Sequence, residues 1–256
     1  MSRIYKVLAC GTVLLGLAAC GGGDASKSAE PSSPAAAPDA KKVDASTAAT
    51  VKGKVVLEGT PPENPVLKMG SDPACGTAEM RAETYAIDNG GLRNVFVYIK
   101  DGLGNKYIFD TPTEPVKLDQ SGCHYVPHVV GVRVTQPLEI VNSDDTLHNI
   151  HGMPETNREF NQGQPVKGMK NTVAFTAPEV MIPLKCDVHA WMHAYVGVVN
   201  HPYFAVSGSG GTFELRGVPP GTYTLEAWHE KLGRQTQSIT LGEKDSKDVT
   251  FTFKVS

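Results

Sequence analysis

The stretch Cys186-Asp-Val-His189-Ala-Trp-Met192 places a thiol, an imidazole and a thioether on one short loop, with the spacing Cys-x2-His-x2-Met. A second stretch, Asn142-Ser-Asp-Asp-Thr-Leu-His148-Asn149, adds a remote imidazole. A thiolate, two imidazoles and a weak thioether are the ligand set of a blue-copper electron-transfer site. The sequence therefore indicates a site for one copper ion, with three ligands on the loop and His148 reaching it from another strand end.

Both stretches belong to a region that resembles the cupredoxins. Its ligand loop is most similar to that of the amicyanins, which share the Cys-x2-His-x2-Met spacing. The strands Pro137-Leu-Glu-Ile-Val-Asn142 and Tyr195-Val-Gly-Val-Val also match, and the resemblance covers roughly residues 112–199. It implies a Greek-key β-sandwich and the copper ligands His148, Cys186, His189 and Met192.

The match departs from the family just after the ligand cysteine, where cupredoxins often have a Ser or Thr bonded to the Asn that follows the first ligand histidine. Asp187 occupies that position here, so its contact with Asn149 is an open question. We expect the Asp187 carboxylate to favour Cu(II) and lower the reduction potential, unless it turns to solvent. His151 and His193 adjoin the ligands, and each either joins a more open site or lies at the surface. Four histidines have no ligand-like spacing and are expected in loops or turns: His124, His128, His201 and His229.

A docking surface is also implied by the resemblance. In cupredoxins the second ligand histidine reaches the surface within an apolar patch where redox partners dock. Ala190 and Trp191 adjoin His189 and are the candidates for such a patch. The alternative for Trp191 is packing against a neighbouring domain.

The C-terminal stretch Gly211-Thr-Phe-Glu-Leu-Arg-Gly-Val-Pro-Pro-Gly-Thr-Tyr-Thr-Leu resembles the carboxypeptidase regulatory-like (prealbumin-like) domains. Those domains usually begin with a Gly-x-Val strand and a later apolar strand. Gly53-Lys-Val-Val-Leu and Asn94-Val-Phe-Val-Tyr-Ile fit these parts, although they precede the copper region. We therefore expect a discontinuous sandwich, residues 51–110 with 200–256, and an inserted cupredoxin domain, residues 111–199.

The residue pattern from position 51 onward indicates strands. Apolar and polar residues alternate in residues 51–57, 172–176, 222–228 and 248–255. Short strands separated by Gly and Pro turns favour sandwiches or barrels. The expected fold class is all-β, a cupredoxin Greek-key sandwich plus a second, smaller prealbumin-like sandwich. The only helix expected is a turn or two around Ala78–Glu83.

The N-terminus resembles a bacterial lipoprotein signal peptide, residues 1–19. A basic start precedes an apolar run and the lipobox-like Leu17-Ala-Ala-Cys20, and the run is too short for a good membrane span. The resemblance implies acyl chains on Cys20 that hold the protein at a membrane surface, with an ordinary secretory signal as the alternative. Gly21 stands where an Asp would suggest inner-membrane retention, so attachment to an outer membrane is favoured, on its periplasmic side, with the cell surface as the alternative. Residues 20–50, rich in Gly, Ala, Ser and Pro, are expected to form a disordered tether.

Five cysteines are present, of which Cys10 lies in the signal and Cys20 is the lipidation site. An exported, oxidising compartment favours disulfides. The economical pairing is Cys75 with Cys123, two loop cysteines, which keeps Cys186 as a thiolate ligand. A bridge that includes Cys186 is the alternative.

Charge and motifs together limit the function. The formal net charge of −3 becomes −5 without residues 1–19, and no basic patch suggests a nucleic-acid partner. We predict a lipid-anchored type 1 copper protein that transfers single electrons between extracytoplasmic proteins, such as a cytochrome or a respiratory oxidase complex. One mononuclear site with no evident open position predicts that the protein is not an enzyme. A copper sensor or storage module, or a surface lipoprotein with a relict site, are the alternatives.

Overall fold

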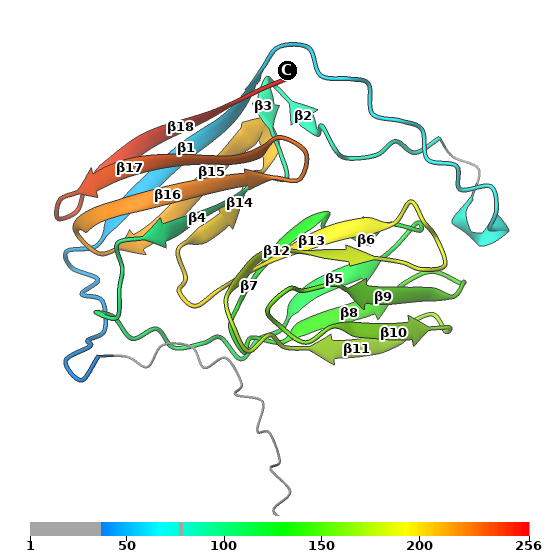
Figure 1. Ribbon diagram of the computed structural model, residues 1–256, viewed down its shortest axis with the longest axis horizontal. Helices are drawn as coiled ribbons and strands as arrows, with labels where there is room; N and C mark the ends of the chain where they lie inside the picture. Colours follow the sequence, from blue (N-terminus) through cyan, green and yellow to red (C-terminus); the bar gives the residue numbers. More distant parts are fainter. Residues whose placement is uncertain (1–36, 77–78, 256) are drawn as a thin grey trace, which may run out of the picture. The chain divides into compact units, whose positions relative to one another are not determined.

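The computed structural model describes residues 37–76 and 79–255, and its sheets are built from strands of two to ten residues (Figure 1). The fold is all-β, as expected. The expected signal peptide, Cys20 and the first part of the tether lie outside the described residues. Within the described ranges, no helix is long and apolar enough to cross a membrane.

Strands from both ends of the chain build one sandwich, here called the first sandwich. One of its sheets has the order β15-β1-β3-β2, with β18 parallel to the other edge of β1, and the other has the order β14-β4-β16-β17. The strand bounds are β1 (Ala49–Glu58), β2 (Ile87–Asp88), β3 (Gly91–Leu92), β4 (Phe96–Asp101), β14 (Phe204–Val206), β15 (Thr212–Val218), β16 (Gly221–His229), β17 (Gly233–Leu241) and β18 (Ser246–Lys254). The central position of β1, paired with both β15 and β18, joins the two ends of the chain.

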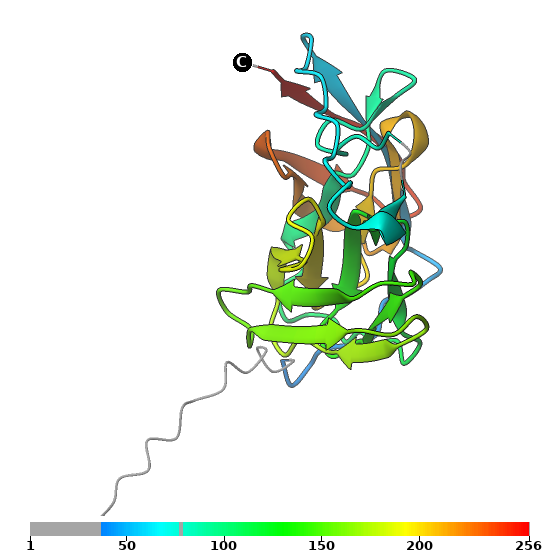
Figure 2. The ribbon, with the colours of Figure 1, turned by 90° about the vertical axis from the view of Figure 1, so that its right-hand side faces the viewer.

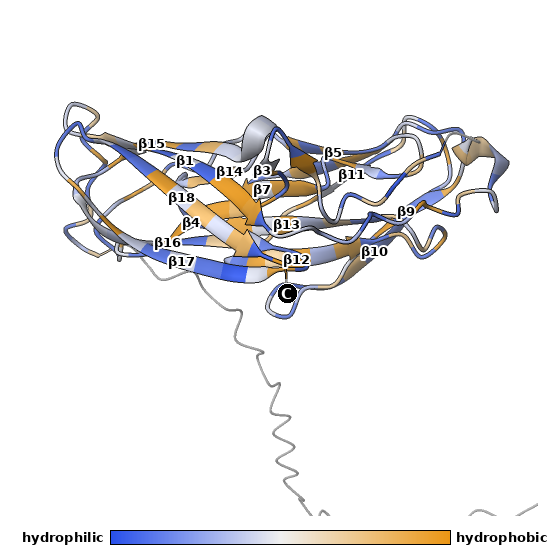
Figure 3. Cartoon of the chain, turned by 90° about the horizontal axis from the view of Figure 1, so that it is seen from above, coloured by the Kyte–Doolittle hydropathy of each residue, from blue (hydrophilic) through white to orange (hydrophobic). Residues whose placement is uncertain are grey.

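The chain between these parts builds a second sandwich. Its sheets have the orders β10-β9-β12-β13-β7 and β11-β8-β5-β6, and their inner faces share one core cluster. The strand bounds are β5 (Val116–Gln120), β6 (Tyr125–Val126), β7 (Val129–Arg133), β8 (Leu138–Asn142), β9 (His148–Gly152), β10 (Phe160–Gln164), β11 (Lys170–Val173), β12 (Glu179–Lys185) and β13 (His193–Val199). Figure 3 shows the resulting pattern: hydrophobic colour gathers on the strands, whereas the solvent-facing β17 is largely hydrophilic.

A long connection between β1 and β2 leaves the first sandwich and reaches the end of the second (Figures 1 and 2). Its described residues include one 3-10 turn, η1 (Pro73–Cys75), and a bridge between Val66 and Arg81. The helix expected around Ala78–Glu83 is wrong for the described part of that range, because Arg81 pairs with an extended partner. A second 3-10 turn, η2 (Ser209–Gly211), precedes β15.

Residues 37–48, expected within the tether, pair with the chain after β4. Lys41 forms a bridge with Tyr107, and the Lys42 ammonium lies 2.6 Å from the Asp110 carboxylate. Backbone hydrogen bonds join Lys41 to Lys106 and Ile108. This part of the expected tether is therefore paired with the folded chain.

The two sandwiches share a small apolar cluster of Phe96, Tyr98, Val129, Met181 and Val199. Gly131 and Gly197 pair with each other across the parallel strands β7 and β13, and the Phe96 ring lies on them. A Cβ atom at Gly197 would lie 2.5 Å from Cζ of Phe96. The glycine pair therefore provides the flat surface on which this fully buried ring packs.

We predict that Gly197→Ala destabilises the protein by about 1–3 kcal/mol, because the added methyl group must displace a buried ring. The free energy of unfolding from chemical denaturation measures this. Gly163→Ala in β10 is the control, since nothing lies within 4 Å of its Cβ position. Equal stability changes in the two variants would contradict the packing described.

Candidate metal centre

The expected ligands meet at the ends of three neighbouring strands. His148 begins β9, Cys186 directly follows β12, and His189 lies in the loop that leads to β13. Strand β12 pairs with both β9 and β13, so the three strand ends are adjacent. Pairing within one sheet thus brings His148, which lies 41 positions before His189 in the sequence, to the loop.

The loop is closed by its own backbone. The Cys186 amide donates to the Met192 carbonyl (3.1 Å), and the Met192 amide donates to the His189 carbonyl (2.9 Å). The His189 amide donates a hydrogen bond to the Cys186 sulfur (3.4 Å). Met192 is buried in the same core cluster as Cys186. The short spacing therefore holds the thiol, imidazole and thioether residues in one compact turn.

Three donor atoms converge without access to solvent. Nδ1 of His148 and Nδ1 of His189 are 3.0 Å apart, and the Cys186 sulfur is 4.0 Å from Nδ1 of His189. All three donors lie within 4.8 Å of one another. The three residues are only 0–2% exposed. This is a buried site with two nitrogen donors and one sulfur donor.

Each imidazole is oriented by a carboxylate on its far side. Nε2 of His148 lies 2.9 Å from Asp144, and Nε2 of His189 lies 3.0 Å from Asp72. A carboxylate at Nε2 keeps the proton on that nitrogen and leaves the lone pair on Nδ1. Burial lowers the pKa of His148, which favours the neutral ring. Both histidines are thus prepared to donate from Nδ1 to one common point.

The two carboxylates are themselves held firmly. Asp72 accepts hydrogen bonds from the Thr146 hydroxyl (2.6 Å) and the Ala74 amide (2.9 Å). The Thr146 hydrogen bond is the main cause that keeps the pKa of Asp72 below its ordinary value. Asp144 accepts from the amides of Gly122 (2.7 Å) and Cys123 (2.8 Å). Sequence reasoning missed both aspartates; the only local sign was Asp144 four residues before His148.

A disulfide ties these two carboxylate loops together. Cys75 and Cys123 are bonded in the structure, as the economical pairing expected, and Cys186 is the free cysteine of the described chain. Cys75 is the last residue of η1, which Asp72 caps at its start. Cys123 follows Gly122, and the backbone amides of both residues donate to Asp144. The bridge therefore fastens the long connection from the first sandwich over His189.

Asn149 and Asp187 are in contact after all. The Asp187 backbone amide donates to the Asn149 side-chain oxygen (2.6 Å), and the Asn149 side-chain amide donates to the Asp187 carboxylate (3.4 Å). The Asp187 carboxylate points outward to Lys185 (2.9 Å), Asn161 (2.7 Å) and His151 (2.9 Å). The Lys185 contact is the largest cause that lowers its pKa. His151 is thereby engaged with carboxylates and does not join the three donors.

The surface beside His189 differs from the expected patch. The Trp191 ring lies tilted beside that of His189, with ring centroids 4.9 Å apart, and its indole N–H donates to the Cys123 carbonyl (3.0 Å). Trp191 is half-buried, whereas Ala190 is exposed. Trp191 therefore packs on the disulfide loop of its own sandwich, and Ala190 remains at the surface.

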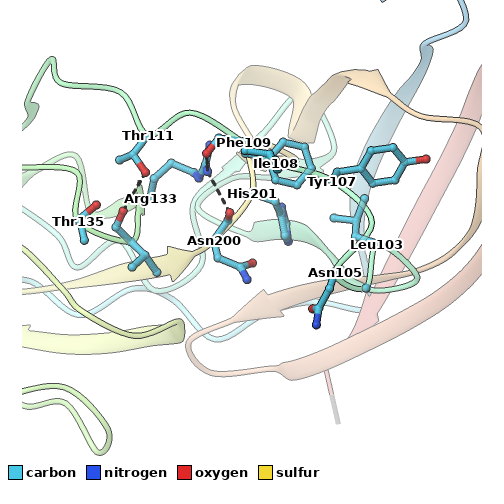
Figure 4. Close-up of a pocket in the computed structure, with 12 residues that line it drawn as sticks. Leu103, Asn105, Tyr107, Ile108, Phe109, Thr111, Arg133, Thr135, Asn200 and His201 are labelled. Carbon is cyan, nitrogen blue, oxygen red and sulfur yellow. Dashed lines mark hydrogen bonds between the residues drawn. The ribbon is translucent and has the colours of Figure 1, made fainter. Parts of the chain in front are cut away.

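The other histidines occupy loops or strand ends, but most of them are buried. His128, His201 and His229 have polar partners inside the protein, and burial lowers the pKa of His201 to about 4. A cavity of about 280 Å³ lies beside His201, next to Arg133 and Phe109 (Figure 4). Arg133 donates there to the Asn200 carbonyl (2.9 Å). None of the expected copper ligands lines this cavity, so it is separate from the metal centre.

Comparisons with known proteins found one matching family model and several similar solved structures. A family model of the carboxypeptidase regulatory-like domain matches residues 192–254. A copper-containing nitrite reductase from Thermus scotoductus SA-01 is similar at 21% identity and a TM-score of 0.31, over 33% of this chain and 22% of that one. This chain thus spans less than a quarter of that enzyme's length.

Two further structures are similar over about the same third of this chain. A Cu(I) form of amicyanin has 20% identity and a TM-score of 0.30, over 33% of this chain and 81% of that one. A purple cupredoxin from Nitrosopumilus maritimus has 18% identity and a TM-score of 0.28, over 32% and 97%. A comparison with curated proteins found no match.

We predict that Asp72→Asn weakens copper binding by roughly 10–100-fold, the usual cost of losing a carboxylate that orients a histidine ligand. It should also raise the reduction potential, because one negative charge near the ion is lost. Competition titration with a copper chelator and voltammetry measure the two effects. Asp145→Asn is the matched control, because Asp145 is exposed and pairs with Lys167. Equal effects of the two variants would show that Asp72 does not act on the metal.

Proposed function

We propose that this protein is a mononuclear type 1 copper protein that carries single electrons. The observation that carries the proposal is the convergence of His148, Cys186 and His189, with Met192 in the same core. One thiolate with two imidazoles is the donor set of blue-copper sites. Bound copper would supply a Cu(II)/Cu(I) couple.

The geometry of the nitrogen donors supports a bound cation. The carboxylates favour a proton on Nε2 of each ring, and the two Nδ1 atoms lie 3.0 Å apart, close enough to bind one ion together. The nearby Cys186 sulfur adds a soft donor, which favours copper over hard cations.

Burial of the donors supports electron transfer over catalysis. A substrate cannot bind to an ion whose protein ligands are only 0–2% exposed, whereas an electron can reach it through packed side chains. The chain holds the ligands with backbone hydrogen bonds and a disulfide, so little has to move on reduction. We therefore propose that the protein is an electron carrier and not an enzyme.

We further propose a docking surface for a protein redox partner, such as a cytochrome or a respiratory oxidase complex. Leu147 and Val188 immediately precede the two histidines and are 44% and 49% exposed, and Ala190 beside them is also exposed. Apolar residues exposed around a redox centre are suited to a transient contact. Trp191 is left out of this surface because it packs on Cys123.

The location and domain organisation are part of the same proposal. Lipid attachment at Cys20 would place the protein outside the cytoplasm, with the outer membrane's periplasmic side favoured. The Cys75–Cys123 disulfide supports an oxidising compartment. We propose domain boundaries at residues 111–199 for the copper domain and 51–110 with 200–256 for the carboxypeptidase regulatory-like domain, whose role is scaffold.

The test is optical. We predict that the chain from residue 37 onward, loaded with Cu(II), shows intense visible absorption from thiolate-to-copper charge transfer and cycles reversibly in voltammetry. Cys186→Ser should abolish the colour, because the hydroxyl cannot replace the thiolate as the charge donor.

Glu155→Gln, a surface change in the second sandwich, is the control and should leave the spectrum unchanged. A protein that binds one Cu(II) yet stays nearly colourless would refute the type 1 assignment. A coloured protein that cannot be reduced and reoxidised would refute the role as an electron carrier.

A further inference from the structure

Metal-ligating side chains also converge at a second place, where the two sandwiches meet. His128 immediately precedes β7 and His193 begins β13, the parallel neighbour of β7. Glu230 follows β16 of the first sandwich and reaches both imidazoles. Nε2 of His128 lies 2.6 Å from one Glu230 oxygen, and Nε2 of His193 lies 3.7 Å from the other.

This cluster is separate from the copper ligands in donors and in position. A ligand atom of each of the three residues lies within 4.8 Å of the other two, and none of the three is a sulfur donor. The His128 and His193 rings are close, with centroids 5.2 Å apart. The chain nevertheless links the two places, since His193 directly follows Met192.

The carboxylate at its centre, Glu230, is largely buried. The side chains of Glu230 and His128 are only 10% and 4% exposed. Burial raises the pKa of Glu230, but the hydrogen bond from His128 and the proximity of His193 keep it below its ordinary value. Within the described ranges, the salt-bridge partners of Glu230 are these two histidines and no lysine or arginine. A buried anion of this kind calls for positive charge beside it.

The cluster also has room beside it. A cavity of about 250 Å³ borders His128 and His193, and its wall includes His124, Met80 and Trp191. His193 is 36% exposed, so the cluster can be reached from solvent. The hydroxyl of Tyr195 lies beside Glu230, and burial together with this carboxylate raises its pKa to about 12, which keeps it a hydrogen-bond donor.

We propose that His128, His193 and Glu230 bind a divalent transition-metal ion of the zinc class. Two imidazoles and one carboxylate are borderline-to-hard donors that suit such ions, and three protein ligands leave a position for water or an exchangeable ligand. Both histidines of the cluster line the cavity, which gives a bound ion's exchangeable ligand room. Because Glu230 belongs to one sandwich and the histidines to the other, the bound ion would cross-link the two.

Cobalt(II) is the probe, because its absorption distinguishes sulfur from nitrogen and oxygen ligands. Titration of the disulfide-intact chain should reveal a cobalt ion with weak ligand-field bands and no sulfur charge transfer, apart from any cobalt bound at Cys186. Glu230→Gln and His128→Gln should each weaken this binding by roughly 100-fold. Loss of a group that only orients a ligand costs about 10–100-fold, and loss of a ligand itself should cost at least as much. Cys186→Ser should leave this cobalt in place and remove only the sulfur charge transfer.

Glu230→Gln nearly preserves the size of the side chain, and circular dichroism of each variant checks that it folds. His124→Ala is the matched control, because His124 borders the same cavity but lies outside the cluster. Absence of sulfur-free cobalt binding would reduce the cluster to an ion pair between the sandwiches and overturn the proposal. So would binding that survives Glu230→Gln, or a loss in His124→Ala as large as that in Glu230→Gln.

Discussion

The candidate metal centre depends on how two imidazole rings are oriented. Carboxylates on the far sides of His148 and His189 turn their Nδ1 atoms toward each other, to a separation of 3.0 Å. With the Nε2 atoms engaged by carboxylates, both Nδ1 atoms are directed to one point, and the Cys186 sulfur lies beside it. A copper ion bound there would be held by all three atoms. Since Asp72 and Asp144 add negative charge close to that point, they should favour the oxidised ion.

The contact between Asp72 and His189 links the two sandwiches. Asp72 belongs to the connection between β1 and β2 of the first sandwich, yet it orients a ligand of the second. The disulfide to Cys123 and the hydrogen bond to Thr146 hold that connection in place. The glycine pair under Phe96 joins the same two parts near their cores. The connection from the first sandwich thus contributes directly to the surroundings of the candidate ligands.

Features that depend on residues close together in the sequence could be predicted from it. Period-two alternation located the long strands, such as β16 and β18, and Cys-x2-His-x2-Met spacing singled out a loop that closes on itself. The orienting role of Asp72 could not be predicted, because it lies 117 residues from His189 and is brought there by the disulfide loop. The convergence of Glu230 on His128 and His193 was hidden for the same reason, since it forms only when the two sandwiches pack.

X-ray absorption at the copper edge of the loaded protein tests the proposed ligand set, because it reports the atoms bonded to the ion. We predict one short copper–sulfur distance and two copper–nitrogen distances, with the sulfur lost in Cys186→Ser. A copper ion surrounded only by nitrogen and oxygen in the unmodified protein would contradict it.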